Sequence, residues 1–309
     1  MNLAGGAGMI GEDQARRLAA QALELSRPDR AEVALKGTSS KLTRFANNTV
    51  HQNVSESDAR VCVRIVQGER VGSAITNRLE PEGLAVAVQK ARLFASESAA
   101  DPHLPAIARQ AVAAGLDSFD QATAEHSPDA RAEAVGELCR RAAGRGLNAS
   151  GAFRVAAEEM AAANSEGTFA YHAGTTADFQ TVVTGDGSSG WAHAAHWKVG
   201  ELSLPGLGEE AIRKAVEGKG PRSFEPQATA VVLDPYATAD LVLMLNLVGM
   251  GAQSLIKGQS WMVDRIGKQA MSEQVNIWDD GRDLEGLPLL FDYEGVAKQR
   301  VDIVKGGVV

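Results

Sequence analysis

The residues Val231–Trp261 constrain the fold of this chain more than any other stretch. They open with a short apolar run that predicts a strand, and Asp234 followed by Pro235 suits the N-cap and the first position of a helix. Every residue of Leu241–Leu245 is apolar, so a helix here has no polar face over those positions. We therefore expect a helix that is buried nearly all round in the core of its domain.

The apolar character of this stretch raises the question of a membrane span. No charged residue occurs between Asp240 and Lys257, but this interval is shorter than a bilayer requires. Asn246, Gly249 and Gly251 also interrupt it. The sequence therefore predicts a core helix and no transmembrane segment.

Composition excludes several other classes of protein. The chain has 309 residues, enough for two or three domains, with 23% charged and 44% hydrophobic residues. Its net charge of -8 argues against a nucleic-acid binder, because no basic stripe is present to neutralise phosphates. The two cysteines, Cys62 and Cys139, do not form a CxxC pair, and the first residues lack the basic leader and apolar run of a signal peptide. We therefore expect a cytoplasmic protein.

Residues 1–107 indicate an N-terminal α+β domain, similar to an α/β sandwich. An amphipathic helix over Glu12–Leu25 is followed by an antiparallel meander and by an alanine-rich helix over Pro81–Ser96. Asn47-Asn48 is a tight-turn signal within the meander, because asparagine tolerates positive φ. The expected strands are Ala31–Leu35, Lys41–Ala46, Thr49–Val54, Arg60–Val66 and Arg70–Ile75.

The small and polar residues 108–127 predict a linker to a mostly antiparallel β region over 128–225. A helix over Pro128–Gly144 opens this region. The next segment, Gly151–Asn164, has the composition of a helix, but the alternation around Phe153 and the turn signal that follows favour a strand. We predict a strand that pairs with the segments after it, two of which are joined by a hairpin turn at Asp186-Gly187.

Two short patterns suggest ligand binding. Gly6–Gly11 matches the GxGxxG dinucleotide fingerprint, but only five residues precede it, whereas the fingerprint requires a preceding strand. His193 and His196 have a spacing that could hold a metal ion on a helix. On the predicted strand they would point to opposite faces. We therefore expect an N-terminal tail and surface histidines, with a metal site at His193 and His196 as the alternative.

Several short stretches, spread over nearly the whole chain, are weak signals one by one. They are LTRFANNTVHQ (Leu42–Gln52), RVCVRIVQGERVGSA (Arg60–Ala74), NSEG (Asn164–Gly167), VVLDP (Val231–Pro235), KGQSWM (Lys257–Met262), Ile266-Gly267, DDG (Asp279–Gly281) and FDYEGV (Phe291–Val296). Taken together and in this order, they resemble the TldD/PmbA family, whose members have been called modulators of DNA gyrase.

The resemblance implies a specific test at the apolar helix. The family's TldD type is a zinc peptidase with an HExxxH motif on the helix after the VVL strand and a further cysteine ligand nearer the C-terminus. The histidines of such a motif share a helix face, and the glutamate activates a zinc-bound water. Here the corresponding window, Leu241–Gly249, reads LVLMLNLVG and contains no His, Glu or Cys. The resemblance is therefore to the PmbA/TldE type, a non-catalytic partner, and we expect residues 226–309 to be the start of an incomplete C-terminal domain.

The resemblance implies a subunit with no cofactor of its own, paired with a zinc-bearing TldD-type subunit or with a second copy of itself. Together the two subunits would enclose a chamber in which unfolded peptides are cut. Our candidates for peptide or interface contacts are Arg44, Asn47, Gln52, Asn164 and Ser165. Two alternatives stay open. One is a non-enzymatic binding protein or homodimer that modulates a partner such as gyrase or an antitoxin, and the other is an independent hydrolase that uses His193 and His196.

Overall fold

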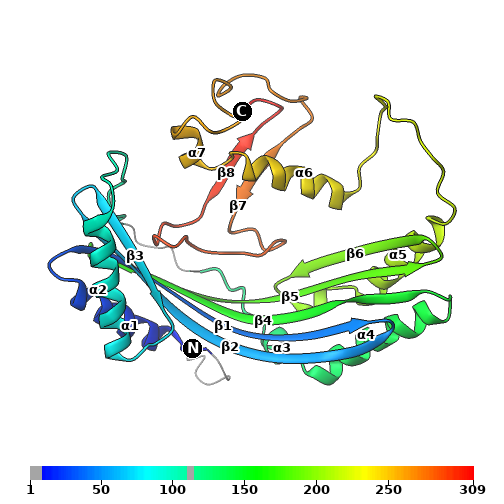
Figure 1. Cartoon of the computed structure of the whole chain (residues 1–309), viewed down its shortest axis with the longest axis horizontal. Coiled ribbons are helices and arrows are strands. Elements are labelled where there is room, and N and C mark those ends of the chain that lie inside the picture. The colour runs from blue at the N-terminus through cyan, green and yellow to red at the C-terminus, as the bar shows by residue number, and fades with distance from the viewer. Residues whose placement is uncertain (1–8, 110–114) are drawn as a thin grey trace. The chain divides into compact units, whose positions relative to one another are not determined.

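The computed structural model describes residues 9–109 and 115–309 of a mixed α+β chain. The chain divides into two compact units: the larger contains residues up to Pro221 together with Gly281–Lys298, and the smaller contains Arg222–Asp280 and Gln299–Val309. Among the described residues, no helix is both long and apolar enough to cross a bilayer. The predicted α+β class, with a large antiparallel sheet, is confirmed (Figure 1).

One six-stranded antiparallel sheet organises the larger unit. The strands lie in the order β3-β2-β1-β4-β5-β6, so β1 and β4 form its centre. They are β1 (Arg30–Ala46), β2 (Thr49–Gln67), β3 (Arg70–Thr76), β4 (Asn148–Asn164), β5 (Phe169–Gly185) and β6 (Ser188–His196). The strands that the sequence placed in two separate regions are therefore halves of one continuous sheet.

The strands are longer than the sequence patterns indicated. β1 joins two predicted strands into one of 17 residues, and β2 does the same with 19 residues. The turns were predicted correctly, since Asn47 and Asn48 have φ of 51° and 60°, and Asp186 has φ of 49° in the β5–β6 hairpin. The choice of strand over helix for Gly151–Asn164 is also confirmed, because these residues lie within β4.

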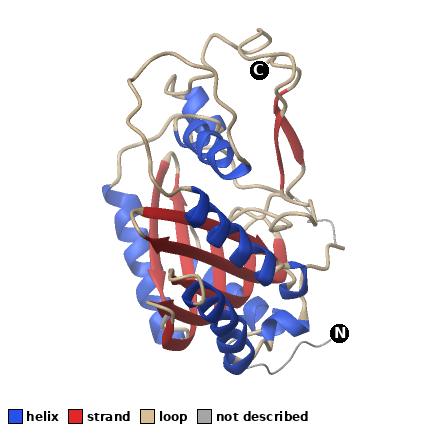
Figure 2. Ribbon diagram, turned by 90° about the vertical axis from the view of Figure 1, so that its right-hand side faces the viewer, coloured by secondary structure: helices blue, strands red, loops and turns tan. Residues whose placement is uncertain are grey.

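Four helices cover one face of this sheet, here called the covered face. They are α1 (Glu12–Ser26), α2 (Pro81–Glu97), α4 (Pro128–Ala143) and α5 (Leu204–Glu217), with short helical turns at α3 (Gln121–Ala124) and η1 (Val199–Glu201). Helices α1 and α2 pack near one end of the sheet, and α4 and α5 near the other (Figure 1). Figure 2 looks at the sheet from the end that carries α4 and α5. The opposite face carries no helix formed by the described residues of the larger unit and is called the open face.

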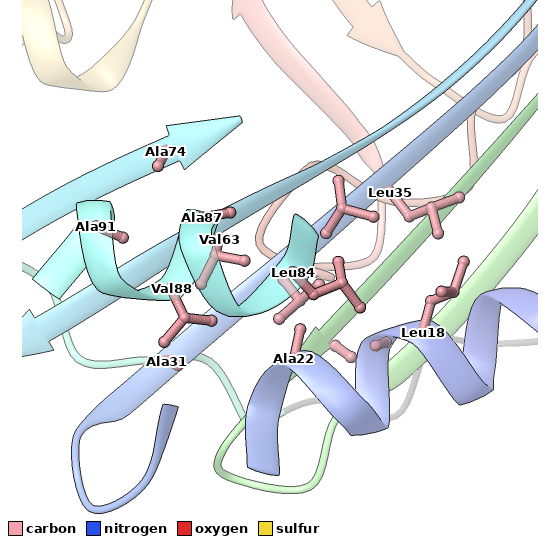
Figure 3. Packing of buried hydrophobic residues seen from close by; sticks show 14 of the residues in the cluster. Leu18, Ala22, Ala31, Leu35, Val63, Ala74, Leu84, Ala87, Val88 and Ala91 are labelled. Atoms are coloured by element: carbon pink, nitrogen blue, oxygen red, sulfur yellow. The ribbon is translucent and has the colours of Figure 1, made fainter. Parts of the chain in front are cut away.

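Buried apolar side chains hold α1 and α2 against the sheet. Figure 3 shows Ala22 of α1 and Leu84 and Val88 of α2 packed around Leu35 and Val63 of the strands, and all five are buried. Burial of this apolar surface provides the main driving force for holding these helices against the sheet. A second cluster around two stacked phenylalanines plays the same role under α4 and α5.

The larger unit is built from two copies of the same arrangement. Each copy is a helix, three antiparallel strands and a second helix, and the copies meet at the β1–β4 pair. Glycine occupies the third position of both edge strands, Gly72 in β3 and Gly190 in β6. A Cβ at Gly72 would lie 2.3 Å from the Ala91 carbonyl oxygen, and one at Gly190 would lie 2.0 Å from that of Ala211. Both glycines are thus required by the close approach of a helix backbone.

The smaller unit contains the apolar helix, and here two expectations were wrong. Its elements are α6 (Pro235–Leu247), α7 (Ala252–Ile256) and the antiparallel pair β7 (Ile277–Asp280) and β8 (Arg300–Val304). No strand forms over Val231–Leu233, and no residue of α6 is buried. Leu243 and Leu247 are 50% and 68% exposed. The predicted burial fails because a short helix and a two-stranded sheet offer too little apolar surface to surround a helix of 13 residues.

Candidate functional site

A pocket of about 220 Å³ lies on the open face of the larger unit. Its floor is a row of cross-strand neighbours: Lys36 of β1 is opposite Met160 of β4, which is opposite His172 of β5. Residues directly opposite in an antiparallel sheet share a face, so these three side chains point to the same side. The other residues that line it include Glu158, Gly174 and Thr176 from the strands and Leu287, Pro288, Leu289 and Tyr293 from a later loop.

The loop wall of the pocket belongs to Gly281–Lys298, which returns to the larger unit. Phe291 anchors it, because its side chain is fully buried in a cluster with Met160, Ala162 and Ala170 of the sheet. Backbone hydrogen bonds brace the loop, with the Leu289 amide donating to the Gly281 carbonyl at 2.7 Å. The wall is therefore a fixed part of the larger unit.

Ion pairs add a second attachment for the same loop. The Arg64 guanidinium pairs with the carboxylate of Glu32 beside it in the sheet, and Glu294 of the loop lies 3.5 Å from the same guanidinium. Burial raises the pKa of the Glu32 carboxyl, and the Arg64 charge partly offsets that effect. The positive charge of Arg64 thus offsets the negative charges of one carboxylate from the sheet and one from the loop.

His172 connects the floor of the pocket to two loops. Its Nε2 lies 3.1 Å from the Ser118 hydroxyl, and the imidazole also makes a hydrogen bond with the Pro288 backbone. Burial lowers the pKa of His172, and the Pro288 bond only partly opposes this, so the neutral ring is the form favoured by the fold. Gly174 makes room for the contact, since a Cβ there would lie 3.1 Å from the Ser118 hydroxyl. Ser118 belongs to the predicted linker, whose later part is thereby fixed to β5.

The GxGxxG pattern at Gly6–Gly11 lies mostly outside the described residues. Its last residue, Gly11, is the N-cap of α1, and its amide donates to the buried Glu159 carboxylate at 2.9 Å, beside the Ile10 amide at 2.6 Å. The Tyr171 hydroxyl donates to the same carboxylate at 2.8 Å. Glu159 thus neutralises the positive end of α1, where an anion is favourable. Within the described part of this pattern, the Ile10 and Gly11 amides therefore already have a protein acceptor.

The five predicted contact residues do not form one cluster. Arg44 and Gln52 are cross-strand neighbours near the β1–β2 turn that contains Asn47, and all three are exposed. Asn164 pairs with Glu32, twelve residues back along β1 from Arg44, which places the two groups roughly 40 Å apart. A single ligand site formed by all five residues is therefore excluded by the register of the sheet.

Asn164 and Ser165 have structural partners in the β4–β5 turn. The Asn164 amide group donates to the Ala108 carbonyl at 2.7 Å, and its carbonyl oxygen accepts from the Thr168 amide at 3.1 Å. The Ser165 hydroxyl accepts from the Ala31 amide at 3.1 Å. These bonds account for the polar residues of the turn without a ligand. Contact with a peptide or a partner subunit stays a prediction for all five residues.

His193 and His196 lie on β6 at positions that face opposite sides of the sheet. His193 Nε2 is 2.9 Å from an Asp178 carboxylate oxygen, whereas His196 Nδ1 accepts from the Lys198 amide at 2.9 Å. The two imidazoles do not converge. Throughout residues 9–109 and 115–309, no group of three or more His, Cys, Asp or Glu side chains is placed to hold a metal ion.

The window of α6 that would have to bind zinc does not fit that ion. Protein ligands for Zn²⁺ are thiolates, imidazoles and carboxylates. The sequence LVLMLNLVG over Leu241–Gly249 offers hydrocarbon, one thioether and the Asn246 amide. No step of a zinc-dependent reaction can therefore be assigned to side chains of this window.

Sequence reasoning missed the pocket itself. Lys36, Met160 and His172 are far apart in the chain and meet only through strand register. One available signal was FDYEGV at Phe291–Val296, which marked the anchoring loop but gave no indication of its position on the sheet.

The sequence places this chain in the PmbA/TldA (TldD/PmbA) metallopeptidase family. Three family models match it in order: the PmbA/TldA metallopeptidase domain 1 over residues 31–114, the central domain over 119–219 and the C-terminal domain over 226–309. Together these matches cover most of the chain.

A curated relative agrees with this assignment, and two solved structures share the fold. The chain is 28% identical to "Metalloprotease PmbA" of Escherichia coli O157:H7 over 93% of this chain and 67% of the relative. Its fold is similar to TldE from Thermococcus kodakarensis, with a TM-score of 0.80 and 20% identity over 95% of this chain and 68% of the other. It is also similar to a putative modulator of DNA gyrase from Bacteroides thetaiotaomicron, with a TM-score of 0.85 and 18% identity over 97% and 72%.

Proposed function

We propose that this chain is the non-catalytic, PmbA/TldE-type subunit of a cytoplasmic peptidase assembly that cuts unfolded peptides. A TldD-type subunit would hold the zinc ion and activate the water. The observation that carries the proposal is the composition of α6, whose window Leu241–Gly249 has no His, Glu or Cys. Without ligands or a general base at that position, this chain cannot supply the chemistry expected from the motif-bearing type.

The exposed apolar surface of α6 supports a role in assembly. Leu241, Leu243, Met244 and Leu247 are each at least half exposed. Contiguous apolar surface of this kind marks protein interaction sites more often than it marks an inert surface. A second polypeptide, either a TldD-type subunit or another copy of this chain, is the occupant that the proposal assigns to this helix.

Co-purification and peptide cleavage test the proposal. An unfolded peptide is to be incubated with the full-length protein alone, with a TldD-type subunit alone, and with the two proteins together. We expect cleavage only in the mixture, because the zinc and the general base come from the second subunit and this chain completes the chamber that encloses the peptide. Efficient cleavage by the isolated chain would refute the non-catalytic assignment. Partner binding that persists after metal chelation, with no peptide shortened in any sample, would favour the alternative of a pure binding protein.

A substitution on α6 tests the assembly surface. Leu243→Glu places a charge on the apolar helix and is expected to weaken association with the TldD-type subunit at least about tenfold, because a buried unpaired carboxylate is unfavourable. Leu93→Glu, at a similarly exposed position of α2, provides the matched control. Sedimentation velocity measures both. Equal association of the two variants would remove α6 from the interface.

A further inference from the structure

The pocket on the open face contains one ammonium group, that of Lys36, that has no ion-pair partner among residues 9–109 and 115–309. No carboxylate among the described residues lies within ion-pairing distance of the half-buried Lys36 ammonium. Arg60 is directly opposite Lys36 on β2, and its own ion pair is with Asp58 at 3.3 Å. Like charges directly opposite in a sheet are destabilising. An anion bound at Lys36 would relieve this repulsion.

The carboxylates and the imidazole that line the pocket already have partners within the protein. Glu158 pairs with Arg154 at 3.2 Å, so its negative charge is compensated along its own strand. The imidazole of His172 is held between Ser118 and the Pro288 backbone. Glu159 also lines the pocket, but its carboxylate accepts from the Ile10 and Gly11 amides and from the Tyr171 hydroxyl. The Lys36 ammonium is therefore the charged group of the lining, among the described residues, that is left to pair with a ligand.

The remaining walls are apolar and the space is small. Met160, Leu287 and Leu289 provide hydrocarbon, and the Tyr293 ring lies at the edge of the same pocket. The volume of about 220 Å³ lies below the range of about 300 to 1,000 Å³ that holds drug-sized ligands. A ligand of this size is comparable to one amino-acid residue.

We propose that this pocket binds a carboxylate carried on a short apolar group, with Lys36 as the cation and Met160 and Leu289 as apolar contacts. A monoanion fits better than a phosphate group, because a phosphate carries about two negative charges and this pocket offers one ammonium to neutralise them. Two sources share this chemistry, the C-terminal residue of a peptide and a free short-chain acid. The inference goes beyond the proposed function, since it concerns binding by this chain alone and requires neither cleavage nor a second subunit.

Direct titration tests the pocket in the full-length protein. The probes are N-acetyl-Gly-Gly-Leu with a free carboxylate, the same peptide as its C-terminal amide, and 4-methylpentanoate as the free acid. We expect the free carboxylate to bind at least about tenfold more tightly than the amide, because only the carboxylate can pair with the Lys36 ammonium. Comparable binding of 4-methylpentanoate assigns the site to small acids, whereas binding of the peptide alone assigns it to peptide termini.

Variants of Lys36 distinguish the loss of its positive charge from a general disturbance of the fold. Lys36→Gln is expected to weaken binding of the free carboxylate about tenfold and to leave the amide unchanged, and Lys36→Arg is expected to retain binding. Lys90→Gln removes the same charge from the exposed surface of α2 and serves as the control. Equal affinities for acid and amide overturn the proposal, as does unchanged carboxylate affinity in Lys36→Gln or no binding at about 10 mM ligand.

Discussion

Replacing Phe291 by alanine tests whether the loop wall of the pocket is held by one buried ring. The side chain is fully buried against Met160, Ala162 and Ala170. Phe→Ala changes in protein cores destabilise by about 3 to 5 kcal/mol, because the transfer free energy is lost and a cavity remains. The clusters under the four helices do not include this ring, so the loss should appear as local opening of Gly281–Lys298 and not as unfolding of the sheet.

A loss of about 3 kcal/mol corresponds to a roughly 100-fold larger opening equilibrium for this loop. Hydrogen exchange measures it at amides whose acceptors are known. The Leu289 amide donates to Gly281 at 2.7 Å and the Lys298 amide to Leu290 at 2.8 Å, so both should lose protection in Phe291→Ala. Amides at the centre of β4 should keep theirs.

The control for this experiment is Tyr293→Ala in the same loop. Tyr293 is 61% exposed, so its removal is expected to change protection of the Leu289 amide by no more than about threefold. Unchanged protection in Phe291→Ala would refute the reasoning, because the wall would then be held by contacts other than the buried ring. Equal losses in both variants would refute it as well.

Three further predictions follow from buried groups. Glu159→Ala removes the acceptor for the Ile10 and Gly11 amides, so exchange in the first turn of α1 should quicken and stability should fall by about 2 kcal/mol. Burial places the pKa of His172 below its usual 6.5, so its contribution to stability is complete above that pH and is lost as the pH falls through the folded-state pKa. Between about pH 7 and pH 5, the melting temperature of the His172→Gln variant should therefore fall less than that of the wild type. Gly190→Val drives a side chain into the α5 backbone and should lower the melting temperature more than Gly187→Ala in the adjacent turn.

Much of the secondary structure could be predicted because local patterns were clear. The alternation within Gly151–Asn164 outweighed its helical composition, and the strand β4 confirms that choice. The long β1 was split in the prediction because its middle lacks apolar alternation. There Gly37 faces the buried Glu159 side chain, where a Cβ would lie 2.3 Å from a carboxylate oxygen. A polar centre on the covered face therefore resembled a break between two strands.

Tertiary features could not be obtained from the same patterns. The two-fold arrangement of the larger unit depends on β1 pairing with β4, which no local signal indicates. Lys36 and His172 enter one pocket only because Met160 lies between them in register. At α6 the local pattern was clear and the prediction was still wrong. An apolar sequence leads to burial only where enough other apolar surface surrounds the helix.

Metal analysis combined with peptide cleavage tests the central claim most directly. The full-length protein, purified alone, is predicted to hold less than one zinc ion per chain and to leave an unfolded peptide intact, while the mixture with a TldD-type subunit cleaves it. Stoichiometric zinc together with cleavage by the isolated chain would contradict the account, because α6 offers no His, Glu or Cys over Leu241–Gly249 to bind or use that metal.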